Sequence, residues 1–303
     1  MKCVVTGGAG FIGSNLVDSL LDKGNEVVVI DNFTSGKKEN CNKNASYYNI
    51  DLSDIEKKSK IKEVICSAEV IFHCAALARV QPSIIDPVKY EVNNTLGTIN
   101  ILKCAADMEV KRVVYSASSS VYGRAEKLPS KESDIVNPIS PYANQKYYGE
   151  LCCKMFSKIY SIQTVSLRYF NVFGERQNVR GAYATVVGVF INQLLNKQPL
   201  TINGNGKQRR DFTYVQDVVN ANILASKSSR VGRGEVVNIG SGINVSINTL
   251  AKSIGGSRKY LDSVDEPFAN LADIKKAKKL LDWEPTVDIL DWIKDYKLLN
   301  GIK

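Results

Sequence analysis

A short apolar run, a glycine-rich turn and an amphipathic helix open the chain, and together they constrain its fold more than any other feature. Residues 2–6 predict a buried strand, the glycines of residues 7–13 form the turn, and the helix runs through about Leu21. Glycines permit a tight turn, let backbone amides approach a pyrophosphate and allow close packing of helix on strand. The pattern therefore predicts a dinucleotide site at the helix N-terminus. The residues expected to contact the cofactor there are Gly7, Gly10, Phe11, Ile12 and Gly13.

A carboxylate at the end of the second predicted strand identifies the dinucleotide. Residues 26–30 are apolar and lead into Asp31, which follows the glycine turn by about twenty residues and can bind both adenosine ribose hydroxyls. The 2′-phosphate of NADP would be repelled by this carboxylate. A glycine turn alone also occurs in ordinary strand-to-helix connections, but the strand, the helix and Asp31 in register predict NAD.

Further along the chain, apolar runs typical of buried strands alternate with segments of helical periodicity. Such alternation implies parallel strands joined by right-handed crossovers. We predict an α/β fold: a doubly wound parallel sheet of the Rossmann type with a smaller α+β substrate-binding domain, built mainly from C-terminal segments. The expected strands are residues 70–73, 112–116, 164–168 and 235–239, and the expected helices are residues 88–107, 141–160, 184–196, 217–226, 246–254, 273–281 and 288–299. The expected domain limits are residues 1–170 and 213–240 for NAD binding, and residues 171–212 and 241–303 for substrate binding.

Charge and cysteine content limit the partners. The net charge is +9, but the lysines are scattered among acidic residues on helical patterns, which favours solvated faces over a nucleic-acid site. A basic protein also suits an acidic substrate such as a nucleotide diphosphate. The seven cysteines are odd in number and lack metal-ligand spacing, which favours the reducing cytoplasm and no bound metal. Because the sequence has no signal peptide and no long apolar run, we expect no membrane partner.

Tyr142 and Lys146 indicate the chemistry. A phenol ionises near pH ~10, so a tyrosine base at neutral pH needs positive charge nearby. On a helix, residues four apart face the same side, so Lys146 can supply that charge. A serine cluster precedes the pair at residues 118–120. His73 is the single histidine, and its position at the end of an apolar strand favours a hydrogen-bonded structural role over a general base.

In their order these motifs resemble the extended short-chain dehydrogenase/reductases, and within them the nucleotide-sugar 4-epimerases of the UDP-glucose 4-epimerase type. The resemblance covers nearly the whole chain. The matching segments are residues 6–13, 31–32, 51–52, 73–76, 94–98, 116–123, 142–146, 168–171 and 210–212, and Asp217.

The resemblance implies NAD-dependent inversion at C4 of a UDP-hexose. Tyr142, as phenolate, would take the proton of the sugar 4-hydroxyl while the C4 hydride passes to NAD, which gives a 4-keto sugar. Ser118 would hydrogen-bond the same oxygen, with Ser119 as an assistant. Lys146 would bind the nicotinamide ribose and lower the pKa of the phenol. The keto sugar would then turn over, and hydride would return to its other face.

The resemblance also assigns residues outside this catalytic group. Asn171 and Arg210 should contact the nucleotide diphosphate, Arg210 through charge-assisted hydrogen bonds. From the residues alone, a loop-capping Asn171 and a surface ion-paired Arg210 stay open. The further cofactor contacts implied are Asn32, Asp51, Leu52, Ala75, Ala76 and Asn94, the last of which should organise the active site from a neighbouring helix.

Three departures from the family pattern concern the substrate. Asn203 stands where an aromatic commonly stacks on uracil, and Ser263 lies where many members carry a diphosphate-binding arginine, for which Arg258 or Lys259 would have to compensate. Asn270 stands where a large aromatic restricts the space beside the sugar 2-substituent, so we expect N-acetylated sugars to be accepted as well as plain ones. Asn270 could instead be a helix-cap residue.

Other activities of the family and a second protein class stay open. Ser119 and Ser120 replace the carboxyl groups of a 4,6-dehydratase, which disfavours elimination because serine is a poor acid or base near neutral pH. The alternatives are a nucleotide-sugar 4-ketoreductase, a UDP-glucuronate 4-epimerase and, from a different class, a non-catalytic dinucleotide sensor. The resemblance further implies a homodimer in which residues 88–107 and 141–160 of each subunit form a four-helix bundle.

Overall fold

The larger part of the molecule is built on a seven-stranded parallel sheet with the strand order β11-β6-β5-β4-β1-β2-β3. The computed structural model describes residues 1–181 and 184–302. The order reverses between β1 and β4, which is the point where ligands bind in open α/β sheets. The strands are β1 (Lys2–Thr6), β2 (Glu26–Ile30), β3 (Ser46–Tyr48), β4 (Val70–His73), β5 (Arg112–Ser118), β6 (Gln163–Tyr169) and β11 (Arg233–Ile239).

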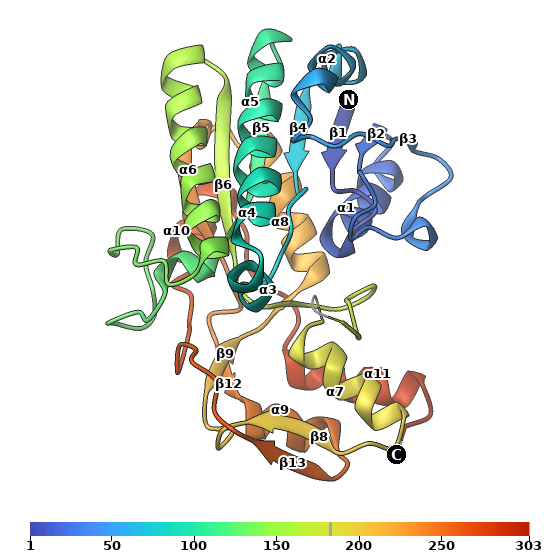
Figure 1. Cartoon of the computed structure of the whole chain (residues 1–303), viewed down its shortest axis with the longest axis vertical. Coiled ribbons are helices and arrows are strands. Elements are labelled where there is room, and N and C mark those ends of the chain that lie inside the picture. The colour runs from blue at the N-terminus through green and yellow to red at the C-terminus, as the bar shows by residue number, and fades with distance from the viewer. Residues whose placement is uncertain (182–183, 303) are drawn as a thin grey trace.

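Helices cover both faces of the sheet (Figure 1), because successive side chains of each buried strand point to opposite sides. Val5 and Phe72 pack toward one layer of helices, whereas their neighbours Val4 and Ile71 pack toward the other. The first layer holds α1 (Phe11–Asp22), α8 (Val215–Lys227) and α10 (Lys275–Leu281), and the second holds α2 (Lys58–Ile65), α5 (Gly97–Asp107) and α6 (Pro141–Tyr160). The doubly wound Rossmann-type fold predicted from the sequence is confirmed.

A smaller unit lies below the carboxyl edge of the sheet in the view of Figure 1. It has its own core, in which Phe190, Leu250 and Ile293 are buried. Its elements are α7 (Val186–Leu195), β8 (Leu200–Asn203), β9 (Arg209–Asp211), β12 (Asn244–Ser246), α9 (Ile247–Ile254), β13 (Arg258–Leu261) and α11 (Ile289–Leu299), and the short parallel pair β7 (Val172–Phe173) and β10 (Thr213–Tyr214) joins it to the sheet unit.

One long helical segment contains a π-helical turn between two α-helical parts. It comprises α4 (Pro87–Glu91), the π-helical turn η3 (Val92–Leu96) and α5. A single turn of π-helix inside an α-helix is often found at functional sites. The short helix α3 (Val80–Ile85) precedes it, and the remaining short elements are the 3₁₀ turns η1 (Lys38–Asn40), η2 (Ile55–Lys57) and η4 (Ser119–Tyr122).

The structure differs from the expected domain limits at α10. Residues 241–303 were assigned to the substrate domain, but the apolar side chains of α10 lie in the core of the sheet unit, and Trp283 just after it is fully buried there. Its indole Nε1 donates to the carbonyl of Asp217 on α8 at 2.8 Å. The α10 segment therefore packs with the sheet. Across residues 1–181 and 184–302, no helix has the length and apolar character needed to span a membrane.

Candidate active site

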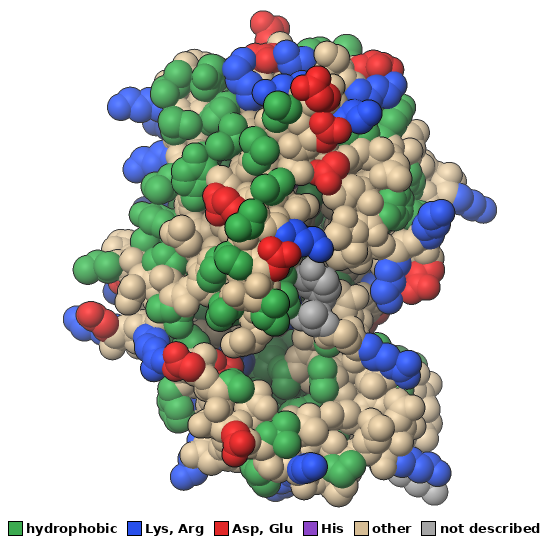
Figure 2. Space-filling model, in the orientation of Figure 1, with side chains coloured by type: hydrophobic (Ala, Val, Ile, Leu, Met, Phe, Trp, Pro, Cys, Tyr) green, Lys and Arg blue, Asp and Glu red, His purple; other side chains and the backbone are tan. Residues whose placement is uncertain are grey.

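A cavity of about 1030 Å³ runs along the carboxyl edge of the sheet and into the space between the two units. Figure 2 shows the surface hollowed between the larger and the smaller unit. With one exception, the site residues expected from the sequence line this cavity. They are Gly7, Gly10, Phe11, Ile12, Gly13, Asp31, Asn32, Asp51, Leu52, Ala75, Ala76, Ser118, Ser119, Tyr142, Lys146, Asn171, Arg210 and Asn270.

The glycine turn brings the N-terminus of α1 against the sheet edge. Gly7 has φ +70°, and a Cβ there would lie 2.7 Å from the amide nitrogen of Ala75. A Cβ on Gly13 would lie 2.2 Å from the carbonyl oxygen of Gly7. Larger residues at either position would push the helix away from the strand ends. The turn thus leaves the backbone amides of the first helical turn open to an anion.

The carboxylate of Asp31 closes one end of the cavity at the tip of β2. Its Oδ2 accepts from the amide of Ala9 at 2.9 Å, and its Oδ1 accepts from the amide of Phe33 at 2.8 Å. These two bonds fix the carboxylate beside the glycine turn. Next to it, Asn32 donates to Asp51 at 3.0 Å, so that both line the same end of the cavity.

These features fit a dinucleotide. The turn offers free amides at a helix N-terminus, and Asp31 holds a carboxylate beside that turn, where it can bind the adenosine ribose. Tyr142 and Lys146 line the same cavity, where they would face the nicotinamide of a bound NAD. Among the residues that the structure describes, no group of three or more His, Cys, Asp or Glu side chains could hold a metal ion.

Tyr142 and Ser118 meet where β5 ends and α6 begins. Ser140 caps α6 by accepting from the amide of Ala143 at 3.2 Å, and Pro141 follows it, so Tyr142 lies in the first helical turn. Burial raises the pKa of the Tyr142 phenol, and a hydrogen bond with Ser118 lowers it in part. The Ser118 hydroxyl accepts from the hydroxyl of Ser120 at 2.9 Å, which leaves its own proton for the phenol oxygen.

Lys146 is buried on α6 and lines the same cavity as Tyr142. Its Nζ donates to the carbonyl of Ser116 at 2.7 Å and lies 5.0 Å from the ring centroid of Tyr115 and 6.0 Å from that of Tyr142. Burial lowers the pKa of Lys146 to about 8. Ser118 and Arg79 lower the pKa of the Tyr142 phenol in part, and the lowering expected from Lys146 stays a prediction.

Arg79 is the site residue that the sequence reasoning missed. It lies between β4 and α3, lines the cavity, and its positive charge lowers the pKa of the Tyr142 phenol. Its backbone has φ +88°, which is unusual for a residue with a side chain and costs roughly 1–3 kcal/mol that the surrounding contacts must outweigh. The feature of the sequence that could have revealed it is a single positively charged residue in the short apolar stretch after a buried strand.

His73 has the structural role expected of it. Its Nε2 bonds the Thr98 hydroxyl at 2.9 Å, and because that hydroxyl donates to the carbonyl of Asn94, Nε2 must carry the proton. Nδ1 then accepts from the hydroxyl of Thr6 at 2.7 Å, and Thr6 accepts from the amide of Ala75. Burial lowers the pKa of His73 to about 3, so the ring is neutral.

Asn94 is the exception among the expected cofactor contacts, because it lies behind the cavity wall. Its Oδ1 accepts from the amide of Leu77 at 2.8 Å, and its Nδ2 donates to the Leu77 carbonyl and to Gln145 Oε1, each at 3.0 Å. Its side chain is buried by these contacts. Asn94 therefore fixes the strand-end loop and α6 relative to each other.

The substrate end of the cavity contains the predicted polar residues in contact with one another. Asn171 donates to Asn270 Oδ1 at 3.2 Å, and the same oxygen accepts from the amide of Asp211 at 2.8 Å. Asn270 thus bonds Asn171 and the end of β9 and does not cap a helix. Arg210 lines the cavity and pairs with Glu266 at 2.7 Å.

Asn203 and Ser263, two of the residues that depart from the family pattern, differ in whether they line the cavity. Asn203 lines the cavity, whereas Ser263 does not. Arg258 and Lys259, which were considered as replacements for the missing arginine, are exposed on β13 and do not line the cavity. The cationic residues among the described lining are Arg79, Lys146 and Arg210.

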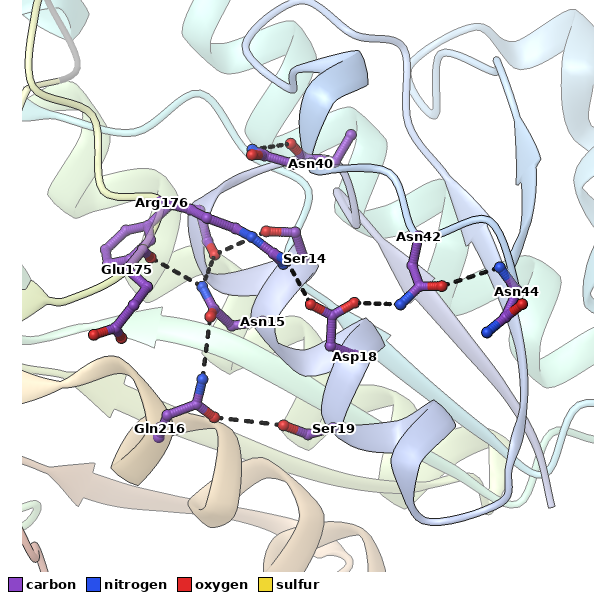
Figure 3. A network of polar contacts seen from close by, with 12 residues as sticks. Ser14, Asn15, Asp18, Ser19, Asn40, Asn42, Asn44, Glu175, Arg176 and Gln216 are labelled. Atoms are coloured by element: carbon purple, nitrogen blue, oxygen red, sulfur yellow. Dashed lines mark hydrogen bonds and ion pairs between the residues drawn. The ribbon is translucent and has the colours of Figure 1, made fainter.

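A polar network holds the segment that leads from the sheet to α7 against α1 (Figure 3). Asn15 donates to the carbonyl of Glu175 at 3.1 Å, and Arg176 pairs with Asp18 at 2.6 Å. Gln216 on α8 donates to Asn15 at 3.1 Å. The same segment continues into residues that line the cavity, so this network fixes one wall of the site to the helix that carries the glycine turn.

The chain is similar in sequence to known proteins. The model of the NAD dependent epimerase/dehydratase family matches residues 3–240. UDP-glucose 4-epimerase of Mycolicibacterium smegmatis is 34% identical over 306 residues, which covers 97% of this chain and 96% of the relative.

Two solved structures are similar over their whole length. UDP-glucose 4-epimerase of Thermotoga maritima with UDP-glucose has a TM-score of 0.93 and 35% identity, with 100% of each chain covered. UDP-N-acetylglucosamine 4-epimerase of Methanobrevibacter ruminantium in complex with UDP-N-acetylmuramic acid has a TM-score of 0.91 and 36% identity, with 99% of this chain and 98% of that chain covered.

The neutral His73 should make the stability depend on pH. In the unfolded chain its pKa is the ordinary 6.5, against about 3 in the folded chain. Below pH 6.5 the unfolded chain binds a proton that the folded chain does not, so stability falls as the pH drops from 6.5 toward 3. We expect the unfolding free energy of His73→Gln to fall less steeply there than that of the wild type, by up to ~1.4 kcal/mol per pH unit.

Urea unfolding at several pH values measures these slopes. Between pH 7 and 8, where His73 is neutral in both states, the two proteins should have parallel slopes, which serves as the internal control. Parallel slopes below pH 6.5 as well would show that the folded ring titrates normally.

Proposed function

The chain belongs to the NAD-dependent epimerase/dehydratase family, and on this basis we propose that it inverts C4 of a UDP-hexose through a 4-keto intermediate. The substrates we propose are UDP-glucose and UDP-galactose, together with their N-acetylated counterparts. The observation that carries the proposal is the hydrogen bond between Tyr142 and Ser118. Both residues line one continuous cavity, which is also lined by the glycine turn and by Arg210.

Different residues of the chain have different roles in the reaction. Tyr142 takes the proton from the sugar 4-hydroxyl and later returns it. The Ser118 hydroxyl stabilises the O4 oxygen of the sugar by hydrogen bonding. NAD supplies the hydride acceptor and donor when bound. Arg210 and Asn171 hold the diphosphate, for which Arg210 must exchange its ion pair with Glu266 for phosphate oxygens.

The serine cluster supports inversion over elimination. Ser119 and Ser120 line the cavity beside Ser118, and Ser120 hydrogen-bonds Ser118. Removal of water from the sugar needs an acid and a base of suitable pKa at this position, and hydroxyls do not provide them.

Cofactor use separates the proposal from its alternatives. An epimerase should purify with NAD and convert UDP-glucose to UDP-galactose without added cofactor. Stoichiometric consumption of added NADH would instead indicate a 4-ketoreductase. Turnover of UDP-glucuronate but not of the UDP-hexoses would indicate a UDP-glucuronate 4-epimerase. Binding of NAD without turnover of any UDP-sugar would indicate a sensor.

Apolar side chains on α6 support a homodimer. Leu151, Met155 and Ile159 recur every four residues and are 47%, 45% and 63% exposed. Hydrophobic side chains gather over α5 and α6 on the face seen in Figure 2. Such a stripe on two neighbouring helices fits a four-helix bundle between two copies.

The cysteines support a reducing compartment. All seven are free thiols, and free thiols persist where the cell keeps cysteine reduced. We therefore propose a cytoplasmic location.

Tyr142→Phe should lower kcat by at least ~10² while the amount of copurified NAD stays the same, because the variant loses the base and keeps the ring. Tyr260→Phe is the control, since Tyr260 is half exposed on β13, outside the cavity lining. Turnover of the Tyr142 variant within a few fold of the control would rule out Tyr142 as the base.

Asn270→Tyr should reduce turnover of UDP-N-acetylglucosamine far more than turnover of UDP-glucose, because the added ring fills the space beside the sugar 2-substituent. Loss of the bonds from Asn171 and Asp211 would affect both substrates alike. Asn270→Ala removes those bonds without filling the space, so its ratio of kcat/KM values should stay near that of the wild type. Equal losses on both substrates in the tyrosine variant would contradict the assignment.

Leu151→Glu together with Met155→Glu should convert the protein to a monomer, because two charges per subunit would be buried in the bundle. Light scattering after size exclusion measures the mass, which for the wild type should be twice that of one chain. Ile243→Glu is the control, at a residue 62% exposed on the smaller unit. A wild type that runs as a monomer would refute the dimer.

A further inference from the structure

Asp211, the last residue of β9, is fully buried and joins segments that lie far apart in the sequence. Its Oδ1 accepts from the amide of Ser241 at 2.7 Å, and its Oδ2 accepts from the amides of Gly242 at 3.1 Å and Ala272 at 2.9 Å. Ser241 and Gly242 follow the sheet strand β11, whereas Ala272 precedes α10. Because a buried carboxylate is costly unless donors surround it, these three backbone amides hold the side chain in one position.

The backbone of Asp211 contacts two of the residues proposed to bind the substrate. Its carbonyl accepts from Asn171 Nδ2 at 2.7 Å, and its amide donates to Asn270 Oδ1 at 2.8 Å. A third, Arg210, is its neighbour in β9 and lines the cavity. Figure 1 shows β9 where the smaller unit meets the sheet unit. The residues that form the substrate end of the cavity are therefore all attached to Asp211.

The side chain of Arg210 is oriented by a segment that Asp211 also holds. Its Nη1 donates to the carbonyl of Phe268 at 3.3 Å, and its Nη2 pairs with Glu266 at 2.7 Å. The same segment continues to Ala272, whose amide donates to the Asp211 carboxylate. Displacement of that carboxylate would therefore move both the backbone of Arg210 and the groups that orient its guanidinium.

We propose that Asp211 is a positioning residue whose buried carboxylate aligns Arg210, Asn171 and Asn270 for the diphosphate and sugar of a nucleotide sugar. Asp211 does not itself line the cavity, so it acts through these three residues. The inference rests on the proposed binding of a UDP-sugar at this end of the cavity. The cofactor end is built from the glycine turn and Asp31, so a defect at Asp211 should affect the substrate and spare NAD.

Two variants disturb the carboxylate in different ways. Asp211→Asn keeps the shape of the side chain, but its NH2 group faces a backbone amide whichever way the carboxamide turns. Gly240→Ala keeps the carboxylate and displaces it. The added Cβ would lie 2.9 Å from Asp211 Oδ2 and 2.4 Å from the Cβ of Ala272.

Asp217→Ala is the matched control for lost stability. Asp217 on α8 is also a buried carboxylate, and its Oδ2 accepts from the amides of Thr286 at 2.9 Å and Val287 at 3.3 Å. It does not line the cavity. Its removal leaves buried donors unpaired, as the changes at Asp211 do, but away from the substrate end.

Titration calorimetry with UDP measures the nucleotide site without turnover. In Asp211→Asn and Gly240→Ala we expect the Kd for UDP to rise at least ~10-fold, because the charged hydrogen bonds to the diphosphate lose their alignment. The amount of copurified NAD should stay at that of the wild type. The KM for UDP-glucose should rise in parallel, with kcat within a few fold, because the interaction lost is one of binding. Asp217→Ala should unfold at lower urea and bind UDP like the wild type.

A wild-type Kd for UDP in folded Asp211→Asn would overturn the proposal. An equal rise in Asp217→Ala would do the same, because the effect would then follow stability alone. If Asp211→Asn does not fold, Gly240→Ala decides by the same comparison. A wild type that binds UDP but converts no UDP-sugar would refute the proposed epimerisation, and the Kd values would still decide the role of Asp211. Absence of UDP binding by the wild type would overturn both.

Discussion

The close contact between the glycine turn and the end of β4 is the constraint on which the rest of the site depends. Side chains at Gly7 or Gly13 would overlap backbone atoms, at 2.7 Å from Ala75 and 2.2 Å from Gly7 respectively. With glycine there, α1 begins directly at the sheet edge, and the ends of β1, β2 and β4 share one cavity. The helix N-terminus can then bind the pyrophosphate at the centre of a dinucleotide, and the carboxylate at the end of β2 can bind its adenosine ribose.

A chain of hydrogen bonds connects this contact to the helix that carries the base. It runs from the Ala75 amide through Thr6, His73 and Thr98 to the carbonyl of Asn94. The side chain of Asn94 continues it to Gln145 on α6. The π-helical turn at η3 brings Asn94 to this position. Satisfied buried networks of this kind specify one arrangement, because breaking any member leaves a buried polar group unpaired. The cofactor end and the proton-transfer end are therefore fixed relative to each other through the protein interior.

Local patterns in the sequence predicted most of the sheet and helices, because buried parallel strands and amphipathic helices carry strong periodicity. The expected helix at residues 141–160 coincides with α6, and the strands differ from those expected by two residues or fewer. The short elements β3, α2 and α3 were missed, as was the attachment of α10 to the sheet, which depends on tertiary contacts of Trp283. Residue types in motifs located the cavity lining, but they could not reveal that Lys146 donates to Ser116 or that the charge of Arg79 lowers the pKa of Tyr142. The first depends on how α6 packs against β5, and the second on a loop with positive φ, neither of which a local pattern encodes.

In the proposed reaction, one phenol and one bound NAD act on the same sugar twice within the cavity between the two units. The most direct test follows a deuterium label at C4 of UDP-glucose through conversion by the protein with its copurified cofactor. The account predicts UDP-galactose that retains the label at C4, because the hydride leaves and returns without exchange. Loss of the label to water, or its release on free NADH, would contradict it.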